Sequence, residues 1–363
     1  MRLREISPLI HKISEGQNLT AEEAQLAFDV CTQEDEEFYY WVALTMGLHA
    51  KGETSDELLG LARSTERFAP RIDLAIDPSD IIDVSGTGGD SIKTLNVSTA
   101  SAFVVAASGV WVAKQGFRSV TGFTGSVDIL EELGINLMDS YRTPRAVAET
   151  LSAAGIVIFF TPFLSEKFRY RSLLPRKMAE IGLRYKWPFH LAAFAYSPVP
   201  MTTRLYGVYS PKYLRVLAEL FQKLGYERGI VCYGEPGLDE ISNLGETQIL
   251  EFSADSIEEY RVMPRDLGLR QAEATEIQTS SKDENMADFL RVLYGVETGP
   301  KRDIVAANAG AALYLMGKAD DLGSGVTLAQ ELIAEGAAAD KLRDFVGVAA
   351  SEERLAQLEE RWL

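Results

Sequence analysis

The stretch DVSGTGGDSIKTLNVST (residues 83–99) decides how the chain is interpreted, because a glycine-rich turn here joins an apolar run to an alanine-rich segment. Gly86, Gly88 and Gly89 lack a Cβ atom, so the main chain can turn sharply and approach a ligand closely. Their spacing matches neither the Walker lysine loop nor the GxGxxG fingerprint of dinucleotide-binding proteins. These glycines therefore indicate a tight turn that connects a strand to a helix.

A helix is predicted to begin between Asn96 and Thr99, shortly after this turn. The free N–H groups and the dipole of a helix N-terminus favour an anion, and the hydroxyl groups of Ser98 and Thr99 add further donors. This combination predicts a phosphate-binding loop. A simpler alternative fits the same residues, namely a glycine-rich turn in which Asn96 or Ser98 only caps the helix.

Short apolar runs alternate with amphipathic segments from residue 81 onward. The runs IIDV (81–84), GVWVA (109–113), GIVIFF (155–160) and RGIVCY (228–233) are typical of buried strands. Thr143-Pro144 and Ser210-Pro211 are typical of helix starts. We therefore expect an α/β fold with a mainly parallel central sheet covered by helices, and ligands at the carboxyl ends of its strands.

The first part of the chain indicates helices only. Thr20 and Thr54 each precede a Glu by three residues, which predicts two capping boxes. The apolar face of residues 35–52 is too wide for an exposed helix, so this unit is expected to pack on something, such as a second subunit. The basic and aromatic segment 167–200 fits the alternation poorly and is expected to return to the helical unit. The predicted domains are a small helical one, residues 1–72 with part of 165–200, packed on a larger α/β one, residues 73–164 and 201–363.

Two further loops are predicted at the ends of strands. Lys114 and Arg118 follow the run 109–113, and a segment rich in Gly and Thr (121–126) precedes the next helix, so basic groups and small donors recur there. Asp239 and Glu240 follow the run 228–233. Adjacent carboxylates on a loop suit Mg²⁺, which prefers hard oxygen ligands, although acidic residues are equally common at an ordinary helix N-terminus.

The composition argues against several classes of function. Cys31, Cys232, His11, His49 and His190 are scattered, so a zinc site or a His-based catalytic triad has little support. With 36 basic and 53 acidic residues the formal net charge is −17, which disfavours non-specific binding to nucleic acid. We expect a cytoplasmic protein, because the start lacks a hydrophobic signal core and no apolar stretch is long enough for a membrane span.

The order of these motifs resembles the anthranilate phosphoribosyltransferase family and, more broadly, the nucleoside phosphorylase type II superfamily. The similarity runs nearly end to end, from GQNLTAEEAQLAFD (16–29) through GTGGD (86–90) and GEPGLDEIS (234–242) to GPKRDIVAANAGAALYLMGKA (299–319). The resemblance implies transfer of the 5-phosphoribosyl group from phosphoribosyl pyrophosphate (PRPP) to an aromatic amine, with release of pyrophosphate and with Mg²⁺ as cofactor. Anthranilate is the default acceptor, in tryptophan biosynthesis, and a homodimer through the helical domain is implied.

The resemblance also implies roles for individual residues. Those implied to bind PRPP are Gly86, Thr87, Gly88, Gly89, Asp90, Asn96, Ser98, Thr99, Lys114 and Ser126. Ser98, Asp239 and Glu240 are implied to hold Mg²⁺. The implied catalytic groups are Lys114, Asp239 and Glu240, which would stabilise the charge of the leaving pyrophosphate. No protein nucleophile is required, because the amine attacks the ribose carbon directly.

The acceptor side departs from the family pattern. Where the family motif reads K-H-G-N-R-S, this chain has KQGFRS (114–119), so Gln115 and Phe117 replace His and Asn. Aligning the family's R-x-x-x-G motif puts Met178 in place of the arginine that meets the anthranilate carboxylate. Arg171 lies two helical turns earlier, and a slip of two residues would make Arg176 the partner instead. The expected acceptor-binding set is Gln115, Gly116, Phe117, Arg171 and Met178.

Four functions stay open at this point. The first is an anthranilate phosphoribosyltransferase with a remodelled acceptor pocket, and the second is a PRPP-dependent transferase for a different, less acidic aromatic or heterocyclic amine. The third is a nucleoside phosphorylase, against which the N-x-S-T motif and the Asp239–Glu240 pair speak. The fourth is a non-enzymatic nucleic-acid-binding relative, against which the net charge of −17 speaks. The expected partners are PRPP and a small amine, with no nucleic acid and no membrane.

Overall fold

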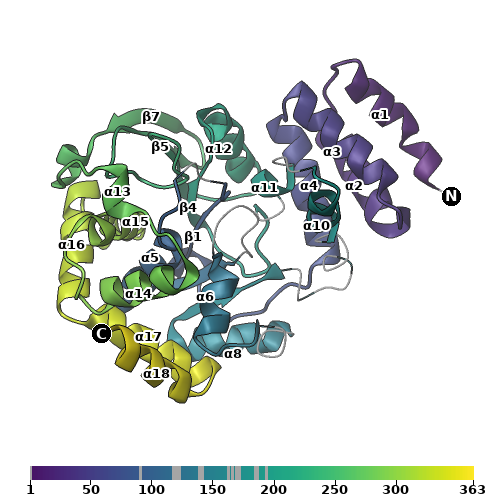
Figure 1. Cartoon of the computed structure of the whole chain (residues 1–363). Helices are drawn as coiled ribbons and strands as arrows, with labels where there is room; N and C mark the ends of the chain where they lie inside the picture. Colours follow the sequence, from purple (N-terminus) through teal and green to yellow (C-terminus); the bar gives the residue numbers. More distant parts are fainter. Residues whose placement is uncertain are drawn as a thin grey trace. The chain divides into compact units, whose positions relative to one another are not determined.

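The computed structural model describes residues 2–89, 92–116, 124–137, 143–161, 164, 167, 173–183, 188–192 and 195–363. The chain divides into two compact units. Unit 1 comprises Met1–Arg71, Thr161–Pro198 and Arg215–Gly225, and unit 2 comprises Ile72–Phe160, Val199–Leu214 and Tyr226–Leu363. The predicted fold class is confirmed, since a helical domain accompanies an α/β domain with a mostly parallel sheet (Figure 1).

Unit 1 is built from helices that come from separate parts of the chain. The first part supplies α1 (Ser7–Ser14), α2 (Ala21–Glu34), α3 (Tyr39–Lys51) and α4 (Ser55–Phe68), after a 3-10 turn over Arg2–Glu5. Later parts supply α10 (Leu173–Glu180), α11 (Pro188–Ala192) and most of α12 (Leu214–Lys223), and α11 contacts α3 and α4. Both predicted capping boxes are present, at Thr20 with Glu23 and at Thr54 with Glu57.

The sheet of unit 2 has seven strands in the order β3-β2-β1-β4-β5-β6-β7. The parallel strands are β1 (Ile81–Gly86), β2 (Trp111–Gln115), β3 (Ile156–Phe159), β4 (Thr203–Gly207) and β5 (Arg228–Gly234). An antiparallel edge follows, made of β6 (Thr247–Ser253) and β7 (Ile257–Val262). Because β2 lies on one side of β1 and β4 on the other, the strand order changes direction between β1 and β4, and open α/β sheets bind ligands at such a switch point.

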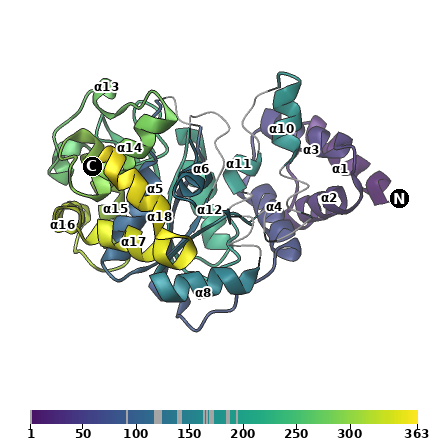
Figure 2. The same ribbon diagram turned by 60° about the horizontal axis from the view of Figure 1, so that its bottom comes forward.

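Helices cover this sheet, which explains why its central strands are buried on both faces. Helix α5 (Val97–Ala107) packs on β1 and β2, α8 (Pro144–Ala154) on β2 and β3, and α15 (Pro300–Leu315) on β4 and β5. Beyond them, α16 (Leu322–Ala334) contacts α15, and α17 (Ala337–Ala349) contacts α5 and α8. The last helix, α18 (Glu352–Trp362), lies along α17 and α14 (Lys282–Leu293), as Figure 2 shows. The remaining short elements are α6 (Ser126–Glu132), α13 (Ala274–Ile277) and 3-10 turns over Pro78–Asp80, Pro211–Tyr213 and Pro264–Leu267.

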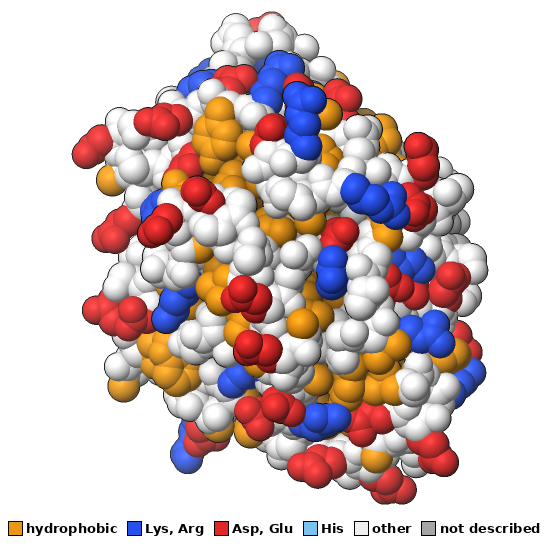
Figure 3. Space-filling model, turned by 90° about the vertical axis from the view of Figure 1, so that its left-hand side faces the viewer, with side chains coloured by type: hydrophobic (Ala, Val, Ile, Leu, Met, Phe, Trp, Pro, Cys, Tyr) orange, Lys and Arg blue, Asp and Glu red, His pale blue; other side chains and the backbone are white. Residues whose placement is uncertain are grey.

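Among the described residues, no helix combines the length and the apolar character that a membrane crossing requires. On the face in Figure 3, acidic side chains are spread widely, basic ones lie between them, and the residues drawn there form no continuous basic patch. That face therefore offers no extended positive surface for a nucleic-acid backbone.

Candidate active site

Three strands of unit 2 end in glycines that meet the same loop. These are Gly86 of β1, Gly207 of β4 and Gly234 of β5. A Cβ atom added at Gly86 would lie 2.2 Å from Asp239 Oδ2. At Gly207 it would lie 1.5 Å from the carbonyl oxygen of the same residue, and at Gly234 it would lie 2.4 Å from that of Glu240. The acidic loop therefore sits directly on the strand ends, in space that any larger residue would fill.

The glycine turn after β1 binds the first carboxylate of this loop. Gly88 and Gly89 have φ angles of +65° and +92°, in the left-handed region that glycine adopts without strain. The Gly88 N–H donates a hydrogen bond to Asp239 Oδ2 at 2.6 Å. Thr87 is buried, and its N–H donates to the Gly207 carbonyl at 3.0 Å. The turn is thus tied both to the neighbouring strand end and to the acidic loop.

Lys114 lies at the end of β2 with its side chain fully buried. Its Nζ donates to the Val84 carbonyl at 2.7 Å and to Ser98 Oγ at 3.2 Å. Burial lowers the pKa of Lys114 to about 8, and three nearby carboxylates, Asp83 foremost, oppose that shift. The ammonium therefore remains available near neutral pH to a phosphate oxygen beside the start of α5.

Glu240 is the residue of the loop whose charge is least compensated. Its side chain is buried, accepts a main-chain hydrogen bond from Ser98, and leaves Oε2 without a hydrogen-bond partner among the described residues. Burial, followed by the charge of Asp239, raises the pKa of Glu240 well above its usual value, while Lys114 acts in the opposite direction. A buried, unpartnered carboxylate oxygen beside a second carboxylate fits a divalent cation. The described part of the chain holds no cluster of three or more acidic, His or Cys side chains that could ligate a metal.

The other predicted donor-side residues lie around the starts of α5 and α6. Asn96 precedes α5, but its side chain makes no cap bond and instead accepts from Thr124 Oγ1 at 2.9 Å. Thr99 is buried in the first turn of α5. Ser126 begins α6 and adjoins Gly116, where an added Cβ would lie 3.2 Å from Ser126 Oγ. Asn96 therefore occupies the N-cap position of α5 without the side-chain cap bond that such a residue usually makes.

The predicted acceptor-side residues divide between the two units. Gln115 is buried at the end of β2, and the following Gly116 donates its N–H to the Phe159 carbonyl at 2.7 Å. Met178 is buried in α10 of unit 1. The predicted site residues Asp90, Phe117 and Arg171 lie outside the described residues, as does the side chain of Arg176. Among the described donor-side residues, Gly88 thus contacts Asp239, and Ser98 contacts both Lys114 and Glu240.

A buried ion pair beneath these loops escapes prediction from the motifs. Asp83 of β1 and Arg204 of β4 are paired in the strand register and fully buried, with Oδ2 and Nη2 2.5 Å apart. Arg204 also donates to the Tyr226 hydroxyl at 3.1 Å, and the Ser85 hydroxyl donates to Asp83 at 2.5 Å. Asp83 interrupts the apolar run IIDV (81–84), and this contrast is the signal in the sequence that could have identified a buried, paired charge.

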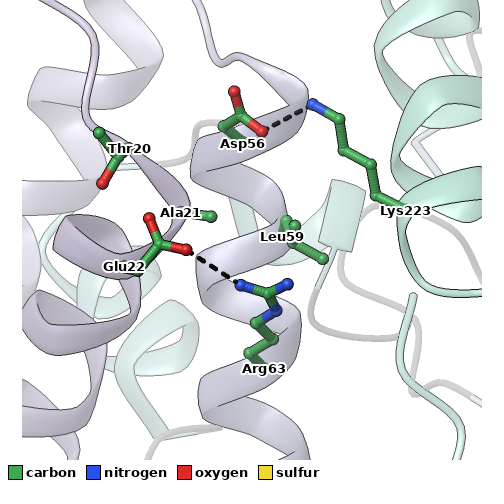
Figure 4. A pocket seen from close by; sticks show the side chains of 7 residues that line it. All are labelled: Thr20, Ala21, Glu22, Asp56, Leu59, Arg63 and Lys223. Carbon is green, nitrogen blue, oxygen red and sulfur yellow. Dashed lines mark hydrogen bonds and ion pairs between the residues drawn. The ribbon is translucent and has the colours of Figure 1, made fainter.

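A separate pocket of about 370 Å³ lies in unit 1 beside α2, α4 and the end of α12 (Figure 4). It is lined by Thr20, Ala21, Glu22, Asp56, Leu59, Arg63 and Lys223. Lys223 pairs with Asp56 at 2.6 Å, and Arg63 pairs with Glu22 at 3.5 Å. The charged side chains of this pocket are thus paired with one another, and no predicted site residue lines it.

Comparison with known families agrees with this division into a helical and an α/β unit. The family model described as "Glycosyl transferase family, helical bundle domain" matches residues 7–69, and the one described as "Glycosyl transferase family, a/b domain" matches residues 78–339. The fold and the loops at the strand ends thus define the class as a two-domain glycosyl transferase.

Individual relatives narrow the class. An anthranilate phosphoribosyltransferase of Haloarcula marismortui is 38% identical over 338 residues, which cover 93% of this chain and 98% of the relative. The crystal structure of the Thermus thermophilus enzyme of the same name has a TM-score of 0.82 at 32% identity, with 94% of this chain and 98% of that chain covered. The Saccharomyces cerevisiae enzyme in complex with PRPP and Mg shares the fold, with a TM-score of 0.84 at 21% identity and coverage of 96% and 99%. The chain belongs to the anthranilate phosphoribosyltransferase family.

Proposed function

We propose that this chain transfers the 5-phosphoribosyl group of PRPP to the amino group of anthranilate and releases pyrophosphate, a step of tryptophan biosynthesis. The relatives at 38% identity and above are named for this activity. The observation that carries the proposal lies in unit 2, where Lys114, the glycine turn and the Asp239–Glu240 loop meet at the switch between β1 and β4. A phosphorylated sugar needs such a combination of main-chain donors, an ammonium and carboxylates for a cation.

In the proposed donor site, each loop binds a different part of PRPP. The glycine turn, with Gly86, Thr87, Gly88, Gly89 and Asp90, lines the pyrophosphate and the ribose. The start of α5, with Asn96, Ser98 and Thr99, binds phosphate oxygens through hydroxyl and main-chain N–H groups, and Ser126 adds another hydroxyl at the start of α6.

Asp239, Glu240 and Ser98 would hold Mg²⁺. When bound, Mg²⁺ supplies positive charge to the pyrophosphate oxygens, and a solved structure of the yeast relative contains both PRPP and Mg. The unpartnered Oε2 of Glu240 and its raised pKa support this assignment, because a cation is what would favour the ionised carboxylate.

The chemistry follows from the charges. The bond between ribose C1 and the pyrophosphate oxygen breaks through an oxocarbenium-like transition state, and the leaving pyrophosphate keeps the electron pair. The amine nitrogen attacks C1 from the opposite face and then loses a proton. Lys114 stabilises the charge that develops on the leaving group, and its bond to Ser98 holds the ammonium beside the start of α5.

The acceptor would be bound by Gln115, Gly116, Phe117, Arg171 and Met178. Gln115 and Phe117 replace the family's His and Asn. In the alignment that also puts Met178 in place of the family's Arg, the anthranilate carboxylate has fewer charged and polar partners. Loss of one charge-assisted pair weakens binding by about 2–5 kcal/mol. We therefore propose that apolar contact with the aromatic ring contributes more of the affinity for the acceptor.

We further propose that two copies associate through unit 1. Apolar side chains on α2 and α3 stay exposed there: Leu26 at 38%, Tyr39 at 71% and Met46 at 38%. Light scattering after size exclusion tests this, because a dimer has twice the mass of the 40.0 kDa chain. A single 40.0 kDa species at micromolar concentration would contradict it.

The activity is tested by following the loss of anthranilate fluorescence with PRPP and Mg²⁺. We expect turnover by the wild type, its loss in Asp239→Asn, and its retention in Glu235→Gln, a matched control whose exposed side chain lies on the same loop. Absence of product from anthranilate, under conditions where calorimetry shows PRPP binding, would contradict the proposed acceptor.

A further inference from the structure

The main chain of the acidic loop is hydrogen-bonded to a side chain of helix α15. Residues 239–242 belong to no helix or strand, so the polar groups of their main chain cannot pair in a regular ladder. For Ile241, the side-chain carboxamide of Asn308 on α15 supplies the hydrogen bonds that a neighbouring strand would otherwise make. Its Oδ1 accepts from the Ile241 N–H at 2.9 Å, and its Nδ2 donates to the Ile241 carbonyl at 3.0 Å.

Asn308 is itself held firmly. It is buried, and the second hydrogen of Nδ2 goes to the Ile304 carbonyl of the same helix at 2.9 Å. A carboxamide offers the same donor and acceptor as a peptide group, so it pairs with Ile241 as a neighbouring strand would. Because α15 packs on β4 and β5, this bond connects the loop to the sheet independently of the strand-end glycines.

We propose that Asn308 is a positioning residue that sets the direction of the Asp239 and Glu240 carboxylates, and so the strength with which the protein holds Mg²⁺ and PRPP. The inference rests on the proposed function. Ile241 directly follows Glu240, so rotation of its peptide group turns the two carboxylates away from Gly88 and from the start of α5. Outer partners of ligand-bearing groups typically change metal affinity by about 10–100-fold when they are removed.

Two variants separate positioning from folding. Asn308→Asp keeps the size and the acceptor oxygen but replaces the donor to the Ile241 and Ile304 carbonyls, and Asn308→Ala removes both functions. The control is Tyr314→Phe on the same helix, which loses one hydrogen bond to Glu251, at 3.1 Å, far along α15 from the loop. Each protein is titrated with Mg²⁺ at fixed PRPP in a calorimeter and in the activity assay, and its melting temperature is measured without ligand.

We expect both Asn308 variants to raise the Mg²⁺ concentration for half-saturation by about 10–100-fold, while the KM for the acceptor amine stays within about twofold. Tyr314→Phe should lower only the melting temperature. If Asn308→Ala does not fold, the Mg²⁺ titration of Asn308→Asp alone tests the inference. A folded Asn308→Asp with the Mg²⁺ half-saturation of the wild type would overturn this inference alone. A wild type that binds no PRPP with Mg²⁺ would overturn the proposed function and this inference with it.

Discussion

Replacing Gly86 by alanine adds one methyl group at the end of β1, where the structure has no room for it. The new Cβ would lie 2.2 Å from Asp239 Oδ2, whereas ordinary contacts begin near 3.4 Å, so the carboxylate has to move by about 1.2 Å. The bond from the Gly88 N–H to that oxygen, now 2.6 Å, cannot survive the displacement. The backbone of Gly86 is not in the left-handed region, so the effect comes from the contact and not from the φ angle.

The expected loss of stability has two parts. A hydrogen bond to a charged group contributes roughly 1.5–3 kcal/mol, and overpacking a filled site costs roughly 1–3 kcal/mol. A total of roughly 2.5–6 kcal/mol lowers the melting temperature of a domain of this size by roughly 5–24 °C. PRPP binding with Mg²⁺ should also weaken by at least about tenfold, because one of the two carboxylates no longer faces the proposed site.

The assay combines thermal melting without ligand and calorimetric titration with PRPP and Mg²⁺. Gly245→Ala is the matched control, since its added Cβ would meet nothing closer than the Glu235 Cβ at 3.5 Å. Combining Gly86→Ala with Asp239→Ala should cost less stability than the sum of the single changes, because the second removes the group that the first displaces. A Gly86→Ala protein that melts and binds PRPP like the wild type would refute the argument that the acidic loop rests on the strand end.

Three further perturbations test other parts of the structure. The pKa of Glu240 is raised in the folded state, so its stabilising contribution is complete below the unfolded value of 4.5 and is lost as the pH rises through the folded pKa. Without Mg²⁺, Glu240→Gln should therefore melt above the wild type near pH 8 and together with it near pH 4, and equal melting at both would count against a raised pKa of Glu240 in the folded state. Arg204→Met leaves Asp83 buried without its partner and should lower the free energy of unfolding in urea by about 3–5 kcal/mol. The double variant with Asp83→Leu should recover most of that loss, and equal losses in the single and the double variant would contradict the pairing. Asp56→Asn breaks the exposed pair with Lys223 and should change stability by less than about 1 kcal/mol in melts at low and high salt, and a larger loss would show that this pair supports unit 1.

Local signals in the sequence predict much of this architecture. The four apolar runs correspond to β1, β2, β3 and β5, and the two threonine caps begin α2 and α4 as expected. Thr143 caps α8 as predicted, whereas the start at Ser210 is first a 3-10 turn and only then becomes α12. Such signals succeed because they depend on a few neighbouring residues and on burial that repeats with a regular period.

Other elements escape prediction because long-range packing decides them. The strand β4 contains Arg204, and a charged residue argues against a buried strand. The strand is buried nonetheless because Arg204 pairs with Asp83, which lies opposite it in β1. Strand β7 is only partly covered and has no apolar run, since it forms the edge of the sheet. Gly207 and Gly234 resemble ordinary turn glycines in the sequence, and their close approach to the acidic loop emerges only when β4 and β5 lie side by side.

Unit 1, the helical unit, is assembled from three separate segments of the chain, of which the last ends at Gly225. During translation its first four helices leave the ribosome well before α12 exists, and the strands β1 to β4 are made in between. A fragment ending at residue 71 would lack the surfaces that α11 supplies to α3 and α4. Exchanging this unit between relatives consequently requires replacement of three segments at five junctions, and a single cut in the chain cannot release it.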